Sequence, residues 1–167
     1  MKRAFLLLLL STLSLLGDEP WPGVPFTEVR AYAWRDDKET EAVILPGMTL
    51  KPGLINKEGA LLIAEQVKVL LSAVTGKHTW HPVAACFYPH NAFVFYDAAK
   101  KPVASIELCF GCFNHRIEPA GTSQYLDFIS LASLFGAHEL PMGEYPDFEA
   151  FEKDFTEANR GERNHNI

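Results

Sequence analysis

Residues 85–116 read ACFYPHNAFVFYDAAKKPVASIELCFGCFNHR and contain all three cysteines and two of the six histidines of the 167-residue chain. Residues 92–97 and 102–110 are rich in aromatic and β-branched side chains, which favour β-strands. The short segment 98–101 between them, with two lysines, is typical of a turn. The stretch therefore predicts a β-hairpin with the cysteines near its ends.

The register of this hairpin depends on the position of its turn. With a turn centred near Lys100, residues that face each other have numbers summing to about 200. Val94 then faces Ile106, and Phe93 faces Glu107. A shift of a single residue would move every side chain to the opposite face of the sheet.

The predicted register brings distant cysteines together. His90 would lie beside Cys109, and the chain around Cys86 would approach Cys112. The hairpin thus groups these four residues into one candidate site, and His115 is a further candidate for it.

Three kinds of chemistry fit the candidate site. The first is a structural disulfide between Cys86 and either Cys109 or Cys112, with the third thiol buried, as is common in exported proteins. Such a bridge would constrain the unfolded chain by about 3 kcal/mol. The second is a metal centre, in which Cys86, His90, Cys109 and Cys112 form a tetrahedral set for zinc or, through their thiolates, for copper(I).

The third is a redox-active pair formed by Cys109 and Cys112, which have the Cys-x-x-Cys spacing of thiol–disulfide enzymes. Such pairs usually sit at the start of a helix, whose N-terminus stabilises the thiolate. Here the chain beyond Cys112 runs into Pro119 and Gly121, which argue against a helix. The residues leave the choice among the three chemistries open.

The N-terminus has the pattern of a secretory signal peptide. Lys2 and Arg3 precede the apolar run AFLLLLLSTLSLLG, which is shorter than the roughly 20 residues of a membrane-spanning helix. Residues 1–17 are therefore predicted to direct the chain to an extracytoplasmic location, periplasmic or secreted. Leu15 departs from the usual small-x-small cleavage pattern, so an uncleaved N-terminal anchor is the alternative.

The net charge argues against nucleic acid as a partner. The 15 Lys and Arg residues include Lys2 and Arg3, so cleavage of the leader would leave 13 against 21 Asp and Glu residues, a net charge of −8. Phosphate binding needs clustered basic side chains. No Gly-x-Ser-x-Gly motif is present in the sequence, so a serine hydrolase of that type is not predicted either.

The rest of the chain predicts further strands and helices. Residues 26–34 and 41–45 predict two strands that could form a hairpin, and residues 83–88 predict another strand. Apolar residues at helical spacing predict a long helix within 58–76, with Asn56 as its cap.

Two more helices are predicted towards the C-terminus. The first covers residues 125–136, with Thr122 or Ser123 as its cap and Gly136 at its end. The second covers residues 146–161 and begins with Pro146.

Together these elements predict a single α+β domain. Its mostly antiparallel sheet of about four or five strands would pack against one long central helix, with two helices at the C-terminal end. The domain is expected to span residues 26–160, after the leader (1–17) and an irregular lead-in (18–25). Residues 161–167 are predicted to be a disordered tail.

Several polar residues outside the cysteine cluster carry expectations of their own. His78 and His81 lie in a predicted loop and are expected on the surface. Glu107 lies within an apolar strand and is expected to be partly exposed. Arg116 is expected to pair with Glu107 or with Glu118.

The chain also resembles an uncharacterised group of exported bacterial proteins. The resemblance rests on CFxPH at 86–90, FVFYD at 93–97, PVAxIExCFxC at 102–112 and Arg116, and it extends over most of residues 26–135. It implies export and implies that Cys86, His90, Cys109 and Cys112 form one site, but it implies no activity. The leader lacks the cysteine expected of lipid-anchored members, which argues against membrane tethering.

We therefore expect an exported, non-enzymatic protein that binds a protein partner or a metal ion. Its cluster of Cys86, His90, Cys109 and Cys112 would be a structural disulfide or a metal-bound centre. The alternatives are a thiol–disulfide oxidoreductase that uses Cys109 and Cys112, and a carrier of zinc or copper.

Overall fold

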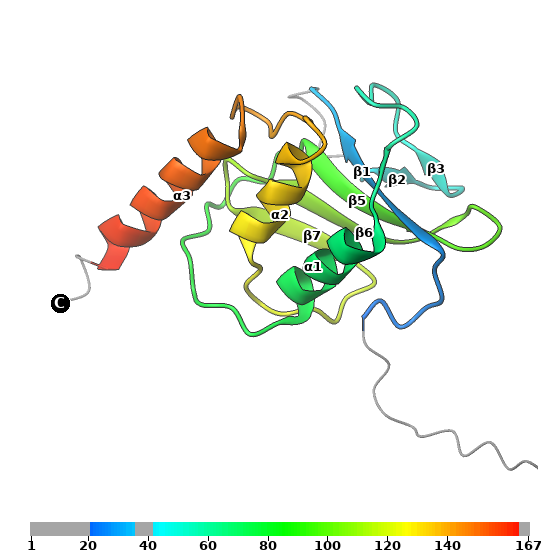
Figure 1. Cartoon of the computed structure of the whole chain (residues 1–167), viewed down its shortest axis with the longest axis horizontal. Coiled ribbons are helices and arrows are strands. Elements are labelled where there is room, and N and C mark those ends of the chain that lie inside the picture. Colours follow the sequence, from blue (N-terminus) through cyan, green and yellow to red (C-terminus); the bar gives the residue numbers. More distant parts are fainter. Residues whose placement is uncertain (1–20, 36–41, 164–167) are drawn as a thin grey trace, which may run out of the picture.

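The predicted hairpin lies within the main sheet (Figure 1). The computed structural model describes residues 21–35 and 42–163, and there β5 (Asn91–Tyr96) pairs antiparallel with β6 (Pro102–Cys109). Every residue of β5 is buried, because both faces of this strand are covered. The predicted hairpin is confirmed.

The register of the hairpin differs from the predicted one by one residue. Phe93 faces Ile106 and not Glu107. The reason lies in the turn, where the carboxylate of Asp97 accepts hydrogen bonds from two backbone N–H groups at 2.8 and 2.9 Å. These bonds close the turn between residues 97 and 101, and a bulge beyond it shifts the remaining pairs.

One antiparallel sheet of five strands contains this hairpin, in the order β4-β1-β5-β6-β7. In it β1 (Glu28–Ala33) lies between β4 (Ala60–Leu61) and β5, while β7 (Asn114–Glu118) pairs with β6 at the other edge. Three helices accompany the sheet within the described residues. The prediction of a single α+β domain with an antiparallel sheet is confirmed.

One predicted strand pairing and one predicted strand are wrong. In the region 41–45, β2 (Ile44–Leu45) pairs with β3 (Thr49–Leu50) and not with β1. A turn at Gly47, with a φ of 91° that favours glycine, reverses the chain at once, and both edges of β1 are already occupied by β4 and β5. Residues 83–88 form no strand.

A helix is present in each of the three predicted helical regions. They are α1 (Ala64–Thr75), α2 (Phe128–Gly136) and α3 (Phe148–Arg163). The caps differ from the prediction, because Asp127 begins α2 by accepting a hydrogen bond from the Ser130 N–H at 3.0 Å. This carboxylate takes the place predicted for Thr122 or Ser123.

Asn56 also has a different role from the predicted cap. Its side chain accepts a hydrogen bond from the Ala33 N–H (3.0 Å) and donates one to the Ala31 carbonyl (2.9 Å). Asn56 therefore holds the loop before β4 against the edge of β1, and α1 begins only after Ile63.

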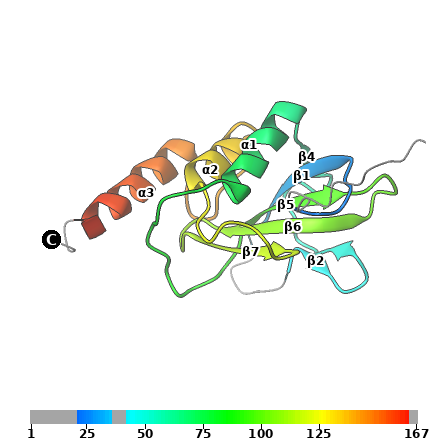
Figure 2. The ribbon, with the colours of Figure 1, turned by 90° about the horizontal axis from the view of Figure 1, so that it is seen from below.

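Figure 2 shows the helices on one side of the sheet and β2 on the other. The helix side carries the larger core, in which side chains of β5 and β6 pack against all three helices. The predicted single long central helix is not confirmed, because α1 shares this face with α2 and α3. The largest fully buried side chains of this core are Phe93, Phe95, Phe110, Phe128, Phe135 and Phe151.

The opposite face of the sheet is covered by the segment that contains β2 and β3. Here a smaller cluster forms around Tyr32, Trp34 and Val94. The ammonium of Lys51 lies 5.1 Å from the centre of the Trp34 ring, a cation–π contact. Both faces of the sheet are therefore covered, which explains why β5 is apolar from Ala92 to Tyr96.

Glu107 projects towards this second face and is 2% exposed, so the expected partial exposure is wrong. Its carboxylate accepts a hydrogen bond from the Val43 N–H at 2.9 Å and forms an ion pair with Arg116. Of the two partners predicted for Arg116, the structure therefore has Glu107. The one carboxylate ties β6 to β7 and to the segment before β2.

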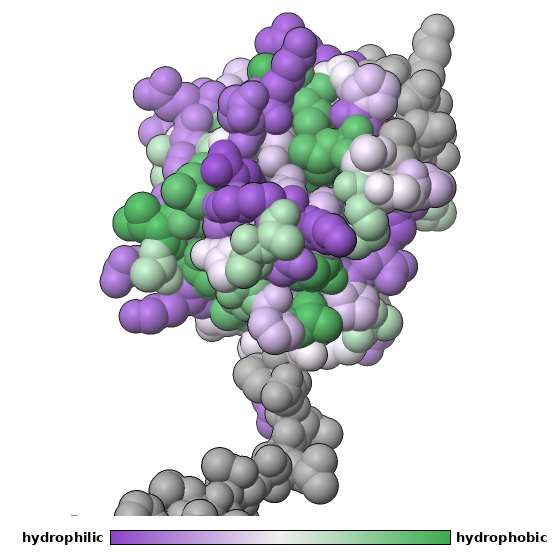
Figure 3. Space-filling model, turned by 90° about the vertical axis from the view of Figure 1, so that its right-hand side faces the viewer, coloured by the Kyte–Doolittle hydropathy of each residue, from purple (hydrophilic) through white to green (hydrophobic). Residues whose placement is uncertain are grey.

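On the face shown in Figure 3, hydrophobic side chains lie in separate groups with hydrophilic side chains between them. No helix within residues 21–35 and 42–163 has both the length and the apolar character needed to cross a bilayer. The predicted tail begins too early, because residues 161–163 are the last residues of α3. Residues 164–167 and the predicted leader, residues 1–17, lie outside the described residues.

We predict that Glu107→Ala lowers the free energy of unfolding by about 2–4 kcal/mol, because it leaves a buried N–H and a half-buried guanidinium without their acceptor. Urea denaturation followed by circular dichroism measures this change. Glu118→Ala, at the exposed end of β7, is the control and should change stability by less than about 0.5 kcal/mol. Equal effects of the two variants would contradict the role given to Glu107.

Candidate functional site

The four predicted site residues lie at one end of the sheet, where β6 ends. Cys86, His90, Cys109 and Cys112 all line the same cleft, which has a volume of about 790 Å³. Its opposite wall is the loop 141–146 between α2 and α3. The structure therefore brings together residues that the sequence places up to 26 positions apart.

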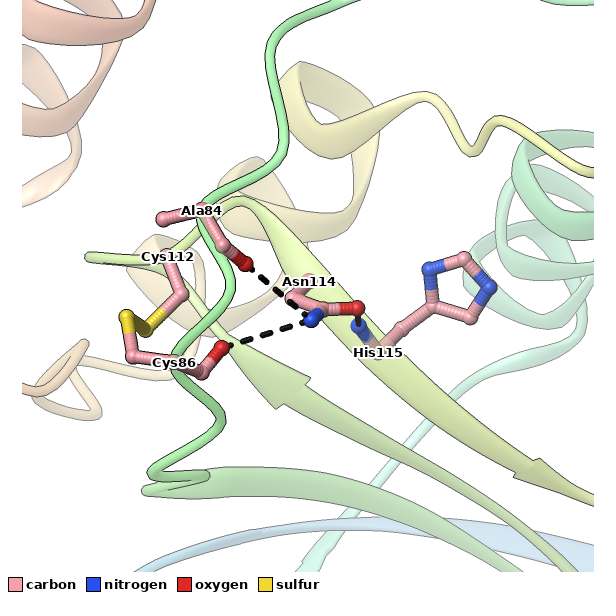
Figure 4. The surroundings of a disulfide bond; sticks show 5 residues. All are labelled: Ala84, Cys86, Cys112, Asn114 and His115. Atoms are coloured by element: carbon pink, nitrogen blue, oxygen red, sulfur yellow. Dashed lines mark hydrogen bonds between the residues drawn. A yellow bond between two sulfur atoms is a disulfide. The ribbon is translucent and has the colours of Figure 1, made fainter.

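The segment 84–90 reaches the cleft without forming a strand. The Ala84 N–H donates to the Cys112 carbonyl at 2.9 Å, and the His90 N–H donates to the Leu108 carbonyl at 3.2 Å. Between these anchors the Asn114 side-chain amide donates to the carbonyls of Ala84 and Cys86 (Figure 4). One side chain thus satisfies backbone groups that a strand would have paired in a ladder.

A disulfide joins this segment to the turn after β6. It links Cys86 and Cys112, whose α-carbons are 6.0 Å apart, and it is one of the two pairings left open by the sequence (Figure 4). The turn itself is closed by the Cys112 N–H, which donates to the Cys109 carbonyl at 3.3 Å. The turn presents Cys112, and not Cys109, to the segment 84–86.

Cys109 is the remaining thiol and is buried beside the bridge. Burial raises the pKa of its thiol, and the backbone N–H groups of Tyr88 and Cys112 offset part of this effect. The carboxylate of Glu144, across the cleft, raises the same pKa further. Cys109 is therefore protonated at neutral pH, which makes it a poor nucleophile.

His90 lies under the loop 141–146. A β-carbon added to Gly143 would be 3.4 Å from the His90 Nδ1 atom, so the loop backbone passes directly over the imidazole. The neighbouring Asn91 side chain donates a hydrogen bond to the Pro141 carbonyl at 2.7 Å and fixes the start of this loop. The imidazole therefore forms part of the cleft wall.

A metal centre at these residues stays a prediction. Within residues 21–35 and 42–163, no three or more His, Cys, Asp or Glu side chains are grouped so that they could hold an ion. Ligating cysteines must be thiolates, so the Cys86–Cys112 disulfide and a three-thiolate centre are alternative states of the same side chains. Zinc or copper would require the reduced protein.

His115 is not part of the cleft. It faces Leu108 across the β6–β7 pair, and both side chains point towards the helix-side core. The His115 ring lies 6.5 Å from the ring of Phe128, and burial lowers the pKa of its imidazole. Successive side chains of a strand point to opposite faces of the sheet. Leu108 and its partner His115 therefore lie on one face, and Cys109, the next residue along β6, lies on the other.

His81 is buried and not at the surface as predicted, with 3% of its area exposed. Its ring packs against Tyr125, Phe128 and Phe155 at centroid distances of 5.2–5.6 Å. Burial lowers the pKa of this imidazole as well. His81 is thus a core residue that fills the space between α2 and α3.

Arg35, Glu144 and Tyr145 are among the further cleft residues that were not predicted from the sequence. Pro141, Gly143 and Pro146 flank Glu144 and Tyr145 in the sequence and predict a loop. This local pattern does not indicate against which part of the sheet the loop packs. The hydroxyl of Tyr145 donates to the Asp154 carboxylate on α3 at 2.6 Å, so the position of the loop depends on tertiary contacts.

Comparisons with models of protein families, with curated proteins and with solved structures found no match.

We predict that peptide mapping without reductant recovers Cys86 linked to Cys112 and Cys109 as a free thiol. Cys86→Ser should lower the free energy of unfolding by about 3 kcal/mol, because the unfolded chain is no longer constrained by the bridge. Cys109→Ser is the matched control and should cost less, since it keeps the bridge. A bridge between Cys109 and Cys112 in the map would contradict this assignment.

We predict that His81 makes stability depend on pH. Its folded pKa lies below the ordinary value of 6.5, so the unfolded chain binds more protons as the pH falls past that value. The stability that the neutral His81 ring contributes is fully present above pH 6.5. It is lost as the pH falls from there through the lower pKa of the folded state. His81→Phe should therefore lessen the fall in unfolding free energy between about pH 7.5 and pH 5.

Urea denaturation across this pH range measures the effect. His138→Gln is the control, since that ring lies against the Gln66 side chain at 3.2 Å and does not act on the His81 ring, and it should keep the slope of the wild-type chain. An unchanged slope in His81→Phe would contradict the prediction.

Proposed function

We propose that this chain is an exported, non-enzymatic binding protein whose ligand occupies the cleft lined by the disulfide. The observation that carries the proposal is that Cys86, His90, Cys109 and Cys112 all line one cleft. Ligand sites are usually concave and combine apolar walls with a few polar groups. This cleft has both, with the rings of Tyr88 and Tyr145 beside the charged side chains of Arg35 and Glu144.

Export is supported by the N-terminal pattern and by the disulfide. A basic start and a short apolar run are typical of a signal peptide, and disulfides persist mainly outside the cytoplasm. The resemblance to exported bacterial proteins points the same way. We propose a periplasmic or secreted location after cleavage of residues 1–17.

The residues of the cleft favour a small polar ligand with an apolar part. Tyr88 and Tyr145 offer aromatic surface, and Arg35 and Glu144 offer opposite charges within the same cleft. Amino acids and short peptides combine these features, because they carry an ammonium, a carboxylate and a side chain. Nucleic acid stays an improbable ligand for a chain of this net charge.

Binding is favoured over thiol catalysis by the state of the cysteines. The oxidoreductase alternative uses Cys109 and Cys112 as an exchanging pair, but here Cys112 is bridged to Cys86 and Cys109 is a buried, protonated thiol. The carrier alternative, with zinc or copper at Cys86, His90, Cys109 and Cys112, applies to the reduced chain.

We predict that free amino acids or dipeptides shift the backbone amide NMR signals of residues around Tyr88, His90 and Glu144. Tyr88→Ala should weaken the affinity by about tenfold, the usual cost of losing an aromatic contact. Trp80→Ala is the control, because Trp80 is 49% exposed against 51% for Tyr88 but lines a different cavity. Shifts confined to the surroundings of Trp80, or no shifts, would refute the proposal.

A further inference from the structure

The two cysteines of the bridge differ in their exposure to solvent. Cys86 is exposed, whereas Cys112 is buried below it, and both line the cleft. Thiolates attack the more accessible sulfur of a disulfide, and exposed bridges are the ones that exchange. A thiol that enters the cleft therefore meets Cys86 first.

The cleft also holds charges that suit one class of thiol. Arg35 and Glu144 both line it, and they carry opposite charges. The planar guanidinium of an arginine matches a carboxylate, and the carboxylate of a glutamate matches an ammonium. An α-amino acid head group carries one of each.

The position of Glu144 relative to the cysteines is defined by the turn after β6. A β-carbon on Gly111 would collide with the Glu144 carboxylate, so this side chain lies directly on the turn that joins Cys109 to Cys112. A head group bound by Glu144 would therefore be held next to the bridge.

We propose that the cleft captures a small thiol with an α-amino acid head group, such as cysteine, as a mixed disulfide with Cys86. This inference rests on the proposed binding function and names the ligand class of the same site. The head group binds between Arg35 and Glu144, and the thiol reaches the exposed sulfur.

The step balances without an oxidant or a reductant. The ligand thiol releases its proton to solvent, and its thiolate forms a bond to the Cys86 Sγ atom while the Cys86–Cys112 bond breaks. The electron pair of that bond stays on Cys112, which takes up a proton. The products are one mixed disulfide and one protein thiol.

Capture is reversible because Cys112 stays in the same cleft. Its thiolate can attack Cys86 again, re-form the original bridge and release the ligand thiol. Cys109, buried and protonated, keeps its thiol throughout.

The experiment compares three small thiols on the full wild-type chain under anaerobic conditions, at equal thiolate concentration. Cysteine has the whole head group, cysteamine lacks the carboxylate, and N-acetylcysteine lacks the ammonium. Quenching with N-ethylmaleimide labels the released thiol, and mass spectrometry of peptides locates both the adduct and the label.

The expected result is an adduct on Cys86 with the label on Cys112. Cysteine should open the bridge about fivefold faster than cysteamine and than N-acetylcysteine, the effect of one charge pair near the surface. In Arg35→Ala, cysteine should no longer react faster than cysteamine. In Glu144→Gln, cysteine should no longer react faster than N-acetylcysteine. Arg160→Ala, on the exposed side of α3, is the control and should change neither ratio.

Two outcomes would overturn the proposal. Equal rates for the three thiols, or an adduct on Cys112, would show that the cleft does not select this class or that Cys86 is not the site. Serine, which has the head group without the thiol, then separates the two proposals. If serine shifts the amide signals of the cleft, the binding function survives and only the capture fails; if it does not and no other amino acid binds, both fail.

Discussion

The antiparallel pairing of β5 with β6 is the interaction on which the rest of the structure depends. It builds the middle of the sheet, provides apolar side chains to both cores, and places His90 and Cys109 at the same end. The pairing is closed by the carboxylate of Asp97, which binds two backbone N–H groups of the turn. Because the side-chain period of a strand is two, this turn decides which residues face which core.

The Cys86–Cys112 disulfide holds the segment 84–90 against the turn after β6. Elsewhere in the sheet, backbone hydrogen bonds between strands have this role. This segment has hydrogen bonds at its ends and one bridging amide, from Asn114, in its middle. A covalent link to the turn after β6 compensates for the missing ladder. It also leaves a sulfur at the surface of a cleft, so the bond that holds the wall of the cleft is itself chemically accessible.

The two faces of the sheet are held in different ways. The helix side is packed by aromatic rings, and its stability comes from buried apolar area. The other side contains a buried carboxylate, Glu107, satisfied by Arg116 and by the backbone of Val43. An ion pair of this kind adds little net stability but strongly penalises any arrangement that leaves one partner alone, so it specifies how the segment before β2 sits on the sheet.

The sequence by itself determined the class of the fold and the identity of the cysteine cluster. Alternating and helical patterns are local, so the β5–β6 hairpin and the three helical regions followed from residue spacing. The hairpin brings Cys86, His90, Cys109 and Cys112 to one end of the sheet even though its predicted register was wrong by one residue. Only the tertiary structure decided the hairpin register, the choice of Cys112 over Cys109 as the partner of Cys86, and the burial of Glu107 and His81. The register depends on the hydrogen bonds of Asp97 in the turn, and the choice of Cys112 depends on the direction of the turn after β6. The burial of Glu107 and His81 depends on packing between elements far apart in the sequence. The loop 141–146 is the clearest case, because its residues reach the cleft through contacts with Asn91 and Asp154 that no local pattern contains.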